Sequence, residues 1–149
     1  MASNRHLEQA LCIEGFATAM CLRPINARII HIPNGGARGK TEQTSKLIGK
    51  KIKDMGGVAG FPDYLILFDD GRFALLEGKL ELKKLRDIVI HKRTDLNPAQ
   101  KIFKAEMAER CGDGLRYGVF RSVDEFIDQL TAFGVRWQFR RLSMARGGA

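Results

Sequence analysis

The chain lacks the features that mark secreted, zinc-binding or membrane-spanning proteins. Its three cysteines, Cys12, Cys21 and Cys111, are an odd number without CxxC or Cys/His spacing, so we expect neither a disulfide framework nor a zinc site. Glu8 and Glu14 interrupt the first apolar stretch, which a signal peptide would keep unbroken. No apolar run approaches the length of a membrane span, and there are no repeats or low-complexity tracts. We therefore expect a soluble, cytoplasmic protein with buried thiols.

Positive charge, in contrast, is abundant. The 149 residues include 25 lysines and arginines against 17 aspartates and glutamates, which gives a formal net charge of +8. The cations cluster in residues 38–53, 79–93 and 136–146. Surfaces of this kind bind polyanions because phosphate contacts release condensed counterions. Solubility alone, or nonspecific adhesion, is the alternative explanation of the charge.

Hydrophobic periodicity and turn residues predict one α/β domain. Apolar residues recur at helical spacing near the N-terminus until Pro24, and Asn97-Pro98 and Ser122 are capping starts of two later helices. The charged stretch 83–95 is either an insertion or an extension of the strand before it. This order predicts a small mixed sheet with helices on its faces. The expected elements are a helix over 5–22, a strand over 27–32, a helix over 41–54, strands over 63–68 and 73–82, a helix over 98–111, a strand over 117–121 and a helix over 122–133.

Residues 61–79, FPDYLILFDDGRFALLEGK, carry the clearest chemical signal. Asp63 opens one apolar run, Asp69-Asp70-Gly71 turns the chain, and the returning run ends at Glu77 and Lys79. A hairpin brings its open ends together, so two carboxylates and an ammonium converge. Hard divalent cations prefer carboxylate oxygens, and phosphate favours a fixed positive charge nearby. The pattern predicts a metal-dependent centre that cleaves phosphodiesters.

Several further motifs occur around this hairpin in a fixed order. They are HIPNGG at 31–36, KDMG at 53–56, GFPD at 60–63, Glu77-x-Lys79 and LNPAQ at 96–100. In order and spacing the chain resembles the VRR-NUC nucleases, a branch of the PD-(D/E)XK, restriction-endonuclease-like superfamily. The resemblance runs from about Leu7 to Leu130. It implies a restriction-endonuclease-like αβββαβ core, a nuclease domain over residues 1–134 with a basic C-terminal extension over 135–149, and a stand-alone bacteriophage member acting in the host cytoplasm.

The resemblance assigns a role to each residue of the hairpin site. Asp63 and Glu77 are the expected metal ligands for Mg²⁺ or Mn²⁺, joined by the backbone carbonyl of Gly78. Lys79 is expected to orient or activate the attacking water and to stabilise charge on the phosphate. Gln100 matches the family glutamine at the start of the next helix, although a buried amide with satisfied hydrogen bonds is its bland alternative.

A further carboxylate is expected from the first helix. The element Leu7-Glu8-x-x-Leu11 matches the family pattern and nominates Glu8 as a metal ligand. The helical wheel instead places Glu14 closer to the apolar face. We favour Glu8, and an exposed glutamate at either position is the alternative.

Two features depart from the family pattern. Gly78 stands where an apolar residue is usual, and a second pair, Glu81 and Lys83, follows the first. If the strand continues to residue 82, the side chains of both pairs share one face, so either pair could be active. The hairpin spacing favours Glu77 with Lys79. The interval from Lys79 to Gln100 is longer than usual and implies an inserted basic loop.

The resemblance also implies a DNA-binding loop beside the cleft. Its residues are Asn34, Gly35, Gly36, Arg38 and Lys40, with Lys53 further along the chain, although Asn-Gly alone is a common turn signal.

The function implied is a Mg²⁺- or Mn²⁺-dependent DNA endonuclease, selective for branched DNA in the manner of Holliday-junction resolvases and acting as a homodimer. The alternatives are a non-catalytic DNA-binding or adaptor protein on a nuclease scaffold, an RNA nuclease, or a nuclease subunit of a larger phage complex.

Overall fold

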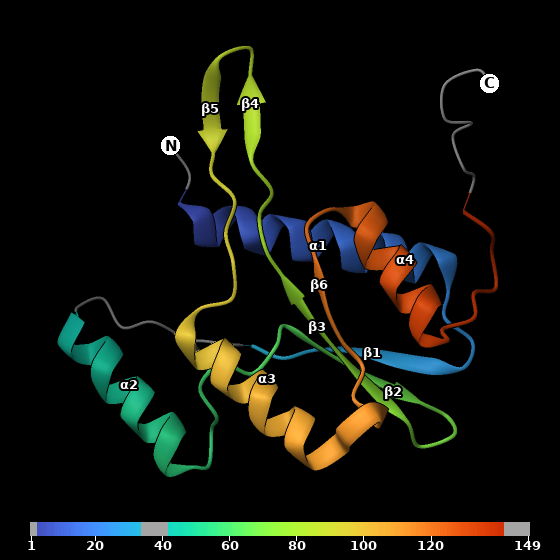
Figure 1. The fold of residues 1–149 in the computed structure, drawn as a ribbon, viewed down its shortest axis with the longest axis horizontal. Helices are drawn as coiled ribbons and strands as arrows, with labels where there is room; N and C mark the ends of the chain where they lie inside the picture. Colours follow the sequence, from blue (N-terminus) through green and yellow to red (C-terminus); the bar gives the residue numbers. More distant parts are fainter. Residues whose placement is uncertain (1–2, 34–41, 142–149) are drawn as a thin grey trace.

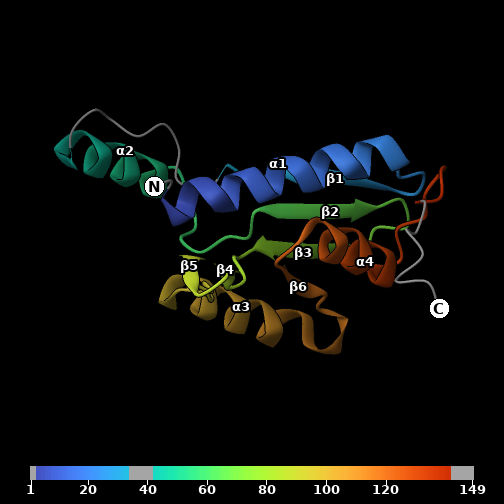
Figure 2. The same ribbon diagram turned by 90° about the horizontal axis from the view of Figure 1, so that it is seen from above.

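The computed structural model describes residues 3–33 and 42–141 and forms an α/β fold. A four-stranded mixed sheet lies at its centre, with helices on both faces (Figures 1 and 2). None of the helices in these ranges is both long and apolar enough to cross a membrane. The elements are α1 (Asn4–Leu22), β1 (Ala27–His31), α2 (Glu42–Asp54), β2 (Tyr64–Phe68), β3 (Phe73–Gly78), β4 (Lys83–Leu85), β5 (Ile88–His91), α3 (Pro98–Cys111), the 3₁₀ turn η1 (Gly112–Gly114), β6 (Tyr117–Phe120) and α4 (Val123–Phe133).

The central sheet has the strand order β1-β2-β3-β6. The first three strands pair antiparallel, and β6 pairs parallel to β3, with Leu75 opposite Tyr117. A parallel partner needs a crossover, and α3 supplies it by covering one face of the sheet while α1 and α4 cover the other (Figure 1). β3 is therefore an interior strand with a partner on each side, and its residues 74–78 are all buried.

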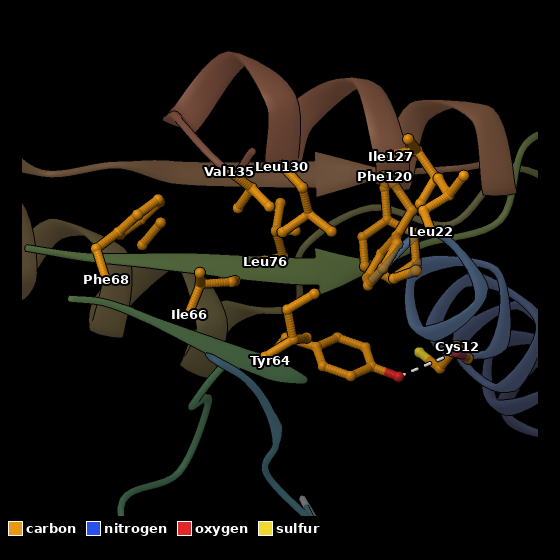
Figure 3. Packing of buried hydrophobic residues seen from close by; sticks show 14 residues of the cluster. Cys12, Leu22, Tyr64, Ile66, Phe68, Leu76, Phe120, Ile127, Leu130 and Val135 are labelled. Atoms are coloured by element: carbon orange, nitrogen blue, oxygen red, sulfur yellow. Dashed lines mark hydrogen bonds between the residues drawn. The ribbon is translucent and has the colours of Figure 1, made fainter. Parts of the chain in front are cut away.

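The hydrophobic core lies between the sheet and the α1/α4 layer. Phe120 and Phe126 meet edge to face at 4.8 Å between ring centroids, and both are fully buried. Tyr64 enters the same cluster and donates a hydrogen bond from its hydroxyl to the backbone carbonyl of Cys12, 3.0 Å away, which satisfies its polar end (Figure 3). Gly15 of α1 faces the Phe126 ring, where a Cβ would lie 3.1 Å from Cγ, so the small residue lets the two helices approach closely.

The helix starts predicted from capping residues are confirmed. The Asn97 side chain accepts a hydrogen bond from the backbone N–H of Gln100, and the Gln100 side chain accepts one from the backbone N–H of Asn97. Together they form a reciprocal capping box at α3. Ser122 caps α4 by accepting from the Glu125 amide. The Glu125 side chain accepts a hydrogen bond from the backbone amide of Arg121, one residue before the cap.

The prediction of a strand over 73–82 is wrong at its end. β3 stops at Gly78, and the chain then leaves the sheet, so that residues 81–90 are all exposed. Residues 83–95 therefore do not extend β3: β4 and β5 form a separate two-stranded sheet, called the ribbon below, which projects beyond α1 (Figure 1).

The segment after α4 packs against the rest of the domain as far as it is described. Val135 is buried, Trp137 forms a β-bridge with Pro24, and the amide of Phe139 donates to the Leu22 carbonyl. Residues 135–141 therefore continue the same fold. The remainder of the expected basic extension, residues 142–149, lies outside the described ranges.

Candidate functional site

The open end of the β2–β3 hairpin brings Asp63 and Glu77 together. Asp63 directly precedes β2 and Glu77 is the penultimate residue of β3. The amide of Gly78 donates to Asp63 Oδ2 at 2.8 Å, and the amide of Asp63 donates to Glu77 Oε2 at 3.2 Å. Each carboxylate thus fixes the backbone that carries the other. This mutual bonding holds both groups at one end of the sheet.

Lys79 places its ammonium beside these carboxylates. It follows β3 and is anchored by its amide, which donates to the Phe120 carbonyl at the end of β6. Its Nζ lies 3.5 Å from Glu77 Oε1 and 4.0 Å from Glu8 Oε1. The residues Glu77 and Lys79 are 3% and 5% exposed. A buried lysine between carboxylates is a charge held in place by the fold, unlike a solvated surface lysine.

Gln100 connects α3 to the same carboxylate. Its Nε2 donates to Glu77 Oε1 at 2.6 Å, while its Oε1 accepts from the Asn97 amide at 2.9 Å. Both ends of the side-chain amide are therefore hydrogen-bonded, as the alternative of a structural buried amide also expects. The capping box fixes the side chain, and the fixed side chain orients Glu77.

The choice between Glu8 and Glu14 is resolved by position. Glu8 lines the same cleft as Asp63 and Glu77, and its Oε1 accepts a 2.8 Å hydrogen bond from Thr94 Oγ1. Glu14 is exposed and does not line the cleft. Of the two glutamates, only the one nominated by the motif match faces the cleft.

The alternative pair does not enter the cleft. Glu81 and Lys83 are exposed, and Glu81 Oε2 pairs with Arg93 Nη1 at 3.3 Å on the surface. The expectation that both pairs share one face of a strand is wrong, because β3 ends at Gly78 before the second pair begins.

Gly78 has a packing reason to be glycine. A Cβ at this position would lie 2.9 Å from Phe120 Cζ and 3.2 Å from Cys12 Sγ. These neighbours belong to the closely packed core, where an added methyl group is strained. The missing side chain is therefore explained by the bulk of Phe120.

A cleft of about 1100 Å³ contains these groups. One wall is α1, and the opposite wall consists of the segments that enter β2 and α3. Its lining includes Arg5, Glu8, His31, Asp63, Glu77, Lys79 and Gln100. Polar and charged groups from separate parts of the chain thus face one cavity.

Burial raises the pKa values of both carboxyl groups in the hairpin site. Burial raises the pKa of Glu77 to about 8, and the neighbouring Asp63 carboxylate adds to the rise. Burial likewise raises the pKa of Asp63, against the lowering effect of the Gly78 amide. Two shielded carboxylates with one nearby lysine are poorly compensated when both are ionised. A divalent cation would stabilise the doubly ionised form.

The donor set fits a hard metal ion in chemical type. Asp63 and Glu77 offer carboxylate oxygens, and the Gly78 carbonyl and Glu8 lie near them in the chain or the cleft. Within residues 3–33 and 42–141, no three His, Cys, Asp or Glu side chains form a preassembled metal-binding group. Metal binding here therefore requires some side-chain rearrangement.

Sequence reasoning missed two residues that support the site. Thr94 Oγ1 donates to Glu8 and accepts from the Leu80 amide at 2.7 Å. Arg121 Nη1 donates to the carbonyls of Leu80 and Thr94 at 2.8 and 2.6 Å. Both residues act through contacts between distant segments. No motif in the sequence marked either of them.

Most of the expected DNA-binding loop cannot be placed. Asn34, Gly35, Gly36, Arg38 and Lys40 lie outside the described residues. Lys53 lies in the last turn of α2, where it is exposed.

No family model, curated protein or solved structure matches the chain. The resemblance to VRR-NUC nucleases therefore stays a prediction from the motifs.

Proposed function

We propose that the chain is a Mg²⁺- or Mn²⁺-dependent DNA endonuclease. The observation that carries the proposal is the convergence of Asp63, Glu77 and Lys79 in one cleft, with Glu77 oriented by Gln100. Carboxylates from a hairpin end beside a buried lysine suit the cleavage of a phosphodiester, which needs metal ligands and a fixed cation. The formal net charge of +8 suits a polyanionic substrate.

The arrangement of elements supports the same proposal. Without α2 and the ribbon, the chain order from α1 to β6 is α-β-β-β-α-β. This is the order that the resemblance to restriction-endonuclease-like nucleases implies. In our proposal α2 and the ribbon are additions to that core.

Each residue of the site has a distinct part in the proposed reaction. Asp63, Glu77 and the Gly78 carbonyl would hold the metal ion, with Glu8 at the edge of the group. When bound, the ion would supply Lewis-acid activation of water and neutralisation of phosphate charge. Lys79 would orient the attacking water and offset the negative charge that develops on the phosphate. Gln100 would keep Glu77 in the geometry that the ion requires.

Nicking of a closed circular plasmid tests the proposal. We expect nicking with Mg²⁺ or Mn²⁺ and none in EDTA. Asp63→Asn and Lys79→Ala should each reduce the rate by at least about a hundredfold, as removal of a transition-state group does, while retaining DNA binding. The matched control is Lys104→Ala, an exposed lysine of α3 outside both the cleft and the ribbon, which should keep its activity. Absence of nicking with every divalent metal would refute the proposed endonuclease activity.

A second candidate is a non-catalytic DNA-binding protein on the same scaffold. It is favoured by the hydrogen bonds that already occupy Asp63 Oδ2 and both oxygens of Glu77. A metal ion would have to share these oxygens with their present donors. DNA binding without cleavage in any metal would support this candidate.

Substrate preference and assembly extend the main proposal. A homodimer would place two sites about a two-fold axis, which suits a symmetric four-way junction. Cleavage of junction, flap, nicked, single-stranded and duplex DNA, compared side by side, would establish the preferred structure.

A further inference from the structure

Every residue of β4 and β5 except His91 is exposed. Residues 81–90 are all exposed, and β4 and β5 pair only with each other within residues 3–33 and 42–141. The ribbon projects past α1, away from the central sheet (Figure 1). A two-stranded hairpin is marginally stable in water by itself. A surface partner would therefore stabilise it.

The two faces of the ribbon differ in character. Leu85 and Ile88 are cross-strand partners, and Ile90 lies two residues beyond Ile88, so all three share one face. Their exposed fractions are 66%, 67% and 39%. Lys84 and Val89 form the pair on the opposite face. One face thus presents three unburied aliphatic side chains at the end of a projecting arm.

Cations flank the apolar residues of the ribbon in the sequence. Lys83 and Lys84 lie on β4, Arg86 lies in the turn, and Lys92 follows β5, against a single acidic residue, Asp87, in the same interval. Arg86 holds a φ of 56°, a left-handed conformation that glycine would adopt without strain. The tip therefore keeps a positive side chain in a position where the backbone alone favours glycine.

The base of the ribbon is fixed to the candidate site. The amide of Thr94 donates to the Leu80 carbonyl. Arg121 donates to the carbonyls of Leu80 and Thr94 and to Asp95 Oδ1. Thr94 in turn donates to Glu8 at the cleft. The base of the ribbon therefore lies beside the cleft that contains Lys79 and the carboxylates.

We propose, on the basis of the DNA substrate proposed above, that the ribbon is an arm that recognises distorted DNA. Lys83, Lys84 and Arg86 contact phosphates, while Leu85 and Ile88 pack against bases that are unstacked at a branch point. Aliphatic side chains inserted at base steps, flanked by cations, are a general means of binding deformed duplexes. Intact duplex has no exposed base faces for these residues to cover.

Charge favours DNA over a second copy of this chain as the occupant. Two ribbons packed face to face would bring their lysines and Arg86 together, with only one acidic residue, Asp87, in each ribbon to offset them. A polyanion neutralises the same cations. The apolar and cationic parts of the ribbon are thus satisfied by one ligand.

Binding experiments in EDTA test the arm without cleavage. The probes are a four-way junction with 2-aminopurine at the branch point and an intact duplex of equal length, with affinity measured by fluorescence anisotropy. Binding of the wild type should raise the fluorescence of 2-aminopurine because that base becomes unstacked. We expect Leu85→Ala/Ile88→Ala to weaken junction binding about tenfold or more, as removal of a side chain that packs on a base does. The same variant should abolish the rise in fluorescence. Duplex affinity should change by less than about twofold.

Charge and control variants complete the test. Lys84→Gln/Arg86→Gln should weaken binding of both probes and reduce the salt slope by about 0.9 for each phosphate that the variant no longer neutralises. The apolar control is Ile25→Ala, which is 54% exposed and follows the end of α1, roughly 20 Å along the helix from Glu8. It should behave like the wild type on both probes.

The outcomes separate the arm from the proposed function. Wild-type protein that binds neither probe overturns the DNA substrate itself. If the wild type binds the junction and Leu85→Ala/Ile88→Ala binds it equally well, the proposed role of the ribbon is refuted, while DNA can still be the substrate. A wild-type dimer in light scattering that this variant splits into monomers, with unchanged junction affinity, shows a self-association surface and also contradicts the arm.

Discussion

Glu77 is held by groups from three parts of the chain. Gln100 of α3 donates to one of its oxygens, the amide of Asp63 donates to the other, and Lys79 lies beside it in sequence and space. A buried carboxylate costs free energy unless such partners compensate it. The partners fix the direction in which the group faces the cleft. At this scale the site is a small hydrogen-bonded network.

Thr94 is the least obvious member of that network, and its substitution is a sensitive test. Thr94→Val keeps the shape of the side chain but leaves the Leu80 amide and Glu8 without their hydroxyl partner. We expect a loss of about 1–3 kcal/mol in the free energy of unfolding, measured by urea denaturation. Mn²⁺ affinity, measured by calorimetry, should also fall because Glu8 is no longer oriented.

The conservative variant distinguishes positioning from packing. Thr94→Ser retains the hydroxyl and should restore Mn²⁺ affinity close to that of the wild type. If Thr94→Val and Thr94→Ser bind Mn²⁺ equally well, Thr94 has a structural role only.

The hairpin residues could be predicted from the sequence because they are local. Asp63, Glu77 and Lys79 lie on adjacent antiparallel segments joined by a tight turn, so spacing alone indicates that they meet. Thr94 follows the ribbon and Arg121 follows β6, and both contact the site across long stretches of sequence. Their contacts depend on how distant segments pack. No local pattern encodes that information.

At the scale of elements, the ribbon and the core are separate structures. No residue of the ribbon belongs to the buried cluster, whose members come from α1, the central sheet, α4 and Val135. The ribbon is attached at its base through Leu80, Thr94 and Arg121. The core should therefore fold without it.

Replacement of residues 83–91 by a short Gly-Ser turn tests this separation. We expect cooperative thermal unfolding, followed by circular dichroism, with a stability within about 1 kcal/mol of the wild type because the buried cluster stays whole. The contrasting variant is Phe126→Ala, which should lose about 3–5 kcal/mol through the cavity it creates. Loss of the cooperative transition in the ribbon variant would show that the insertion is part of the folding core.

Helices were easier to predict than strand ends. Asn97 and Ser122 indicate helix starts through side chains that bond to nearby amides. The end of β3 has no such signal, since residues 79–82 continue to alternate apolar and charged residues. The strand ends at Gly78 because the next segment turns toward Thr94. The parallel pairing of β6 with β3 is likewise a long-range property.

At the scale of the whole molecule, the candidate site residues lie together at one end of the sheet. The start of β2, the end of β3, the N-terminal part of α1 and the N-terminus of α3 all meet at the cleft. The basic helix α2 and the ribbon lie near this end of the sheet (Figures 1 and 2). A polyanion that enters the cleft would therefore find positive charge nearby.

The most direct test compares one buried and one exposed glutamate in the same assay. Wild type, Glu77→Gln and Glu81→Gln are incubated with a four-way junction and with closed circular plasmid in Mn²⁺, and product is measured over time. We predict that Glu77→Gln loses cleavage by at least about a hundredfold, whereas Glu81→Gln cleaves at the wild-type rate. Full activity in Glu77→Gln, or no cleavage by the wild type on either substrate, would contradict the proposed metal-dependent site.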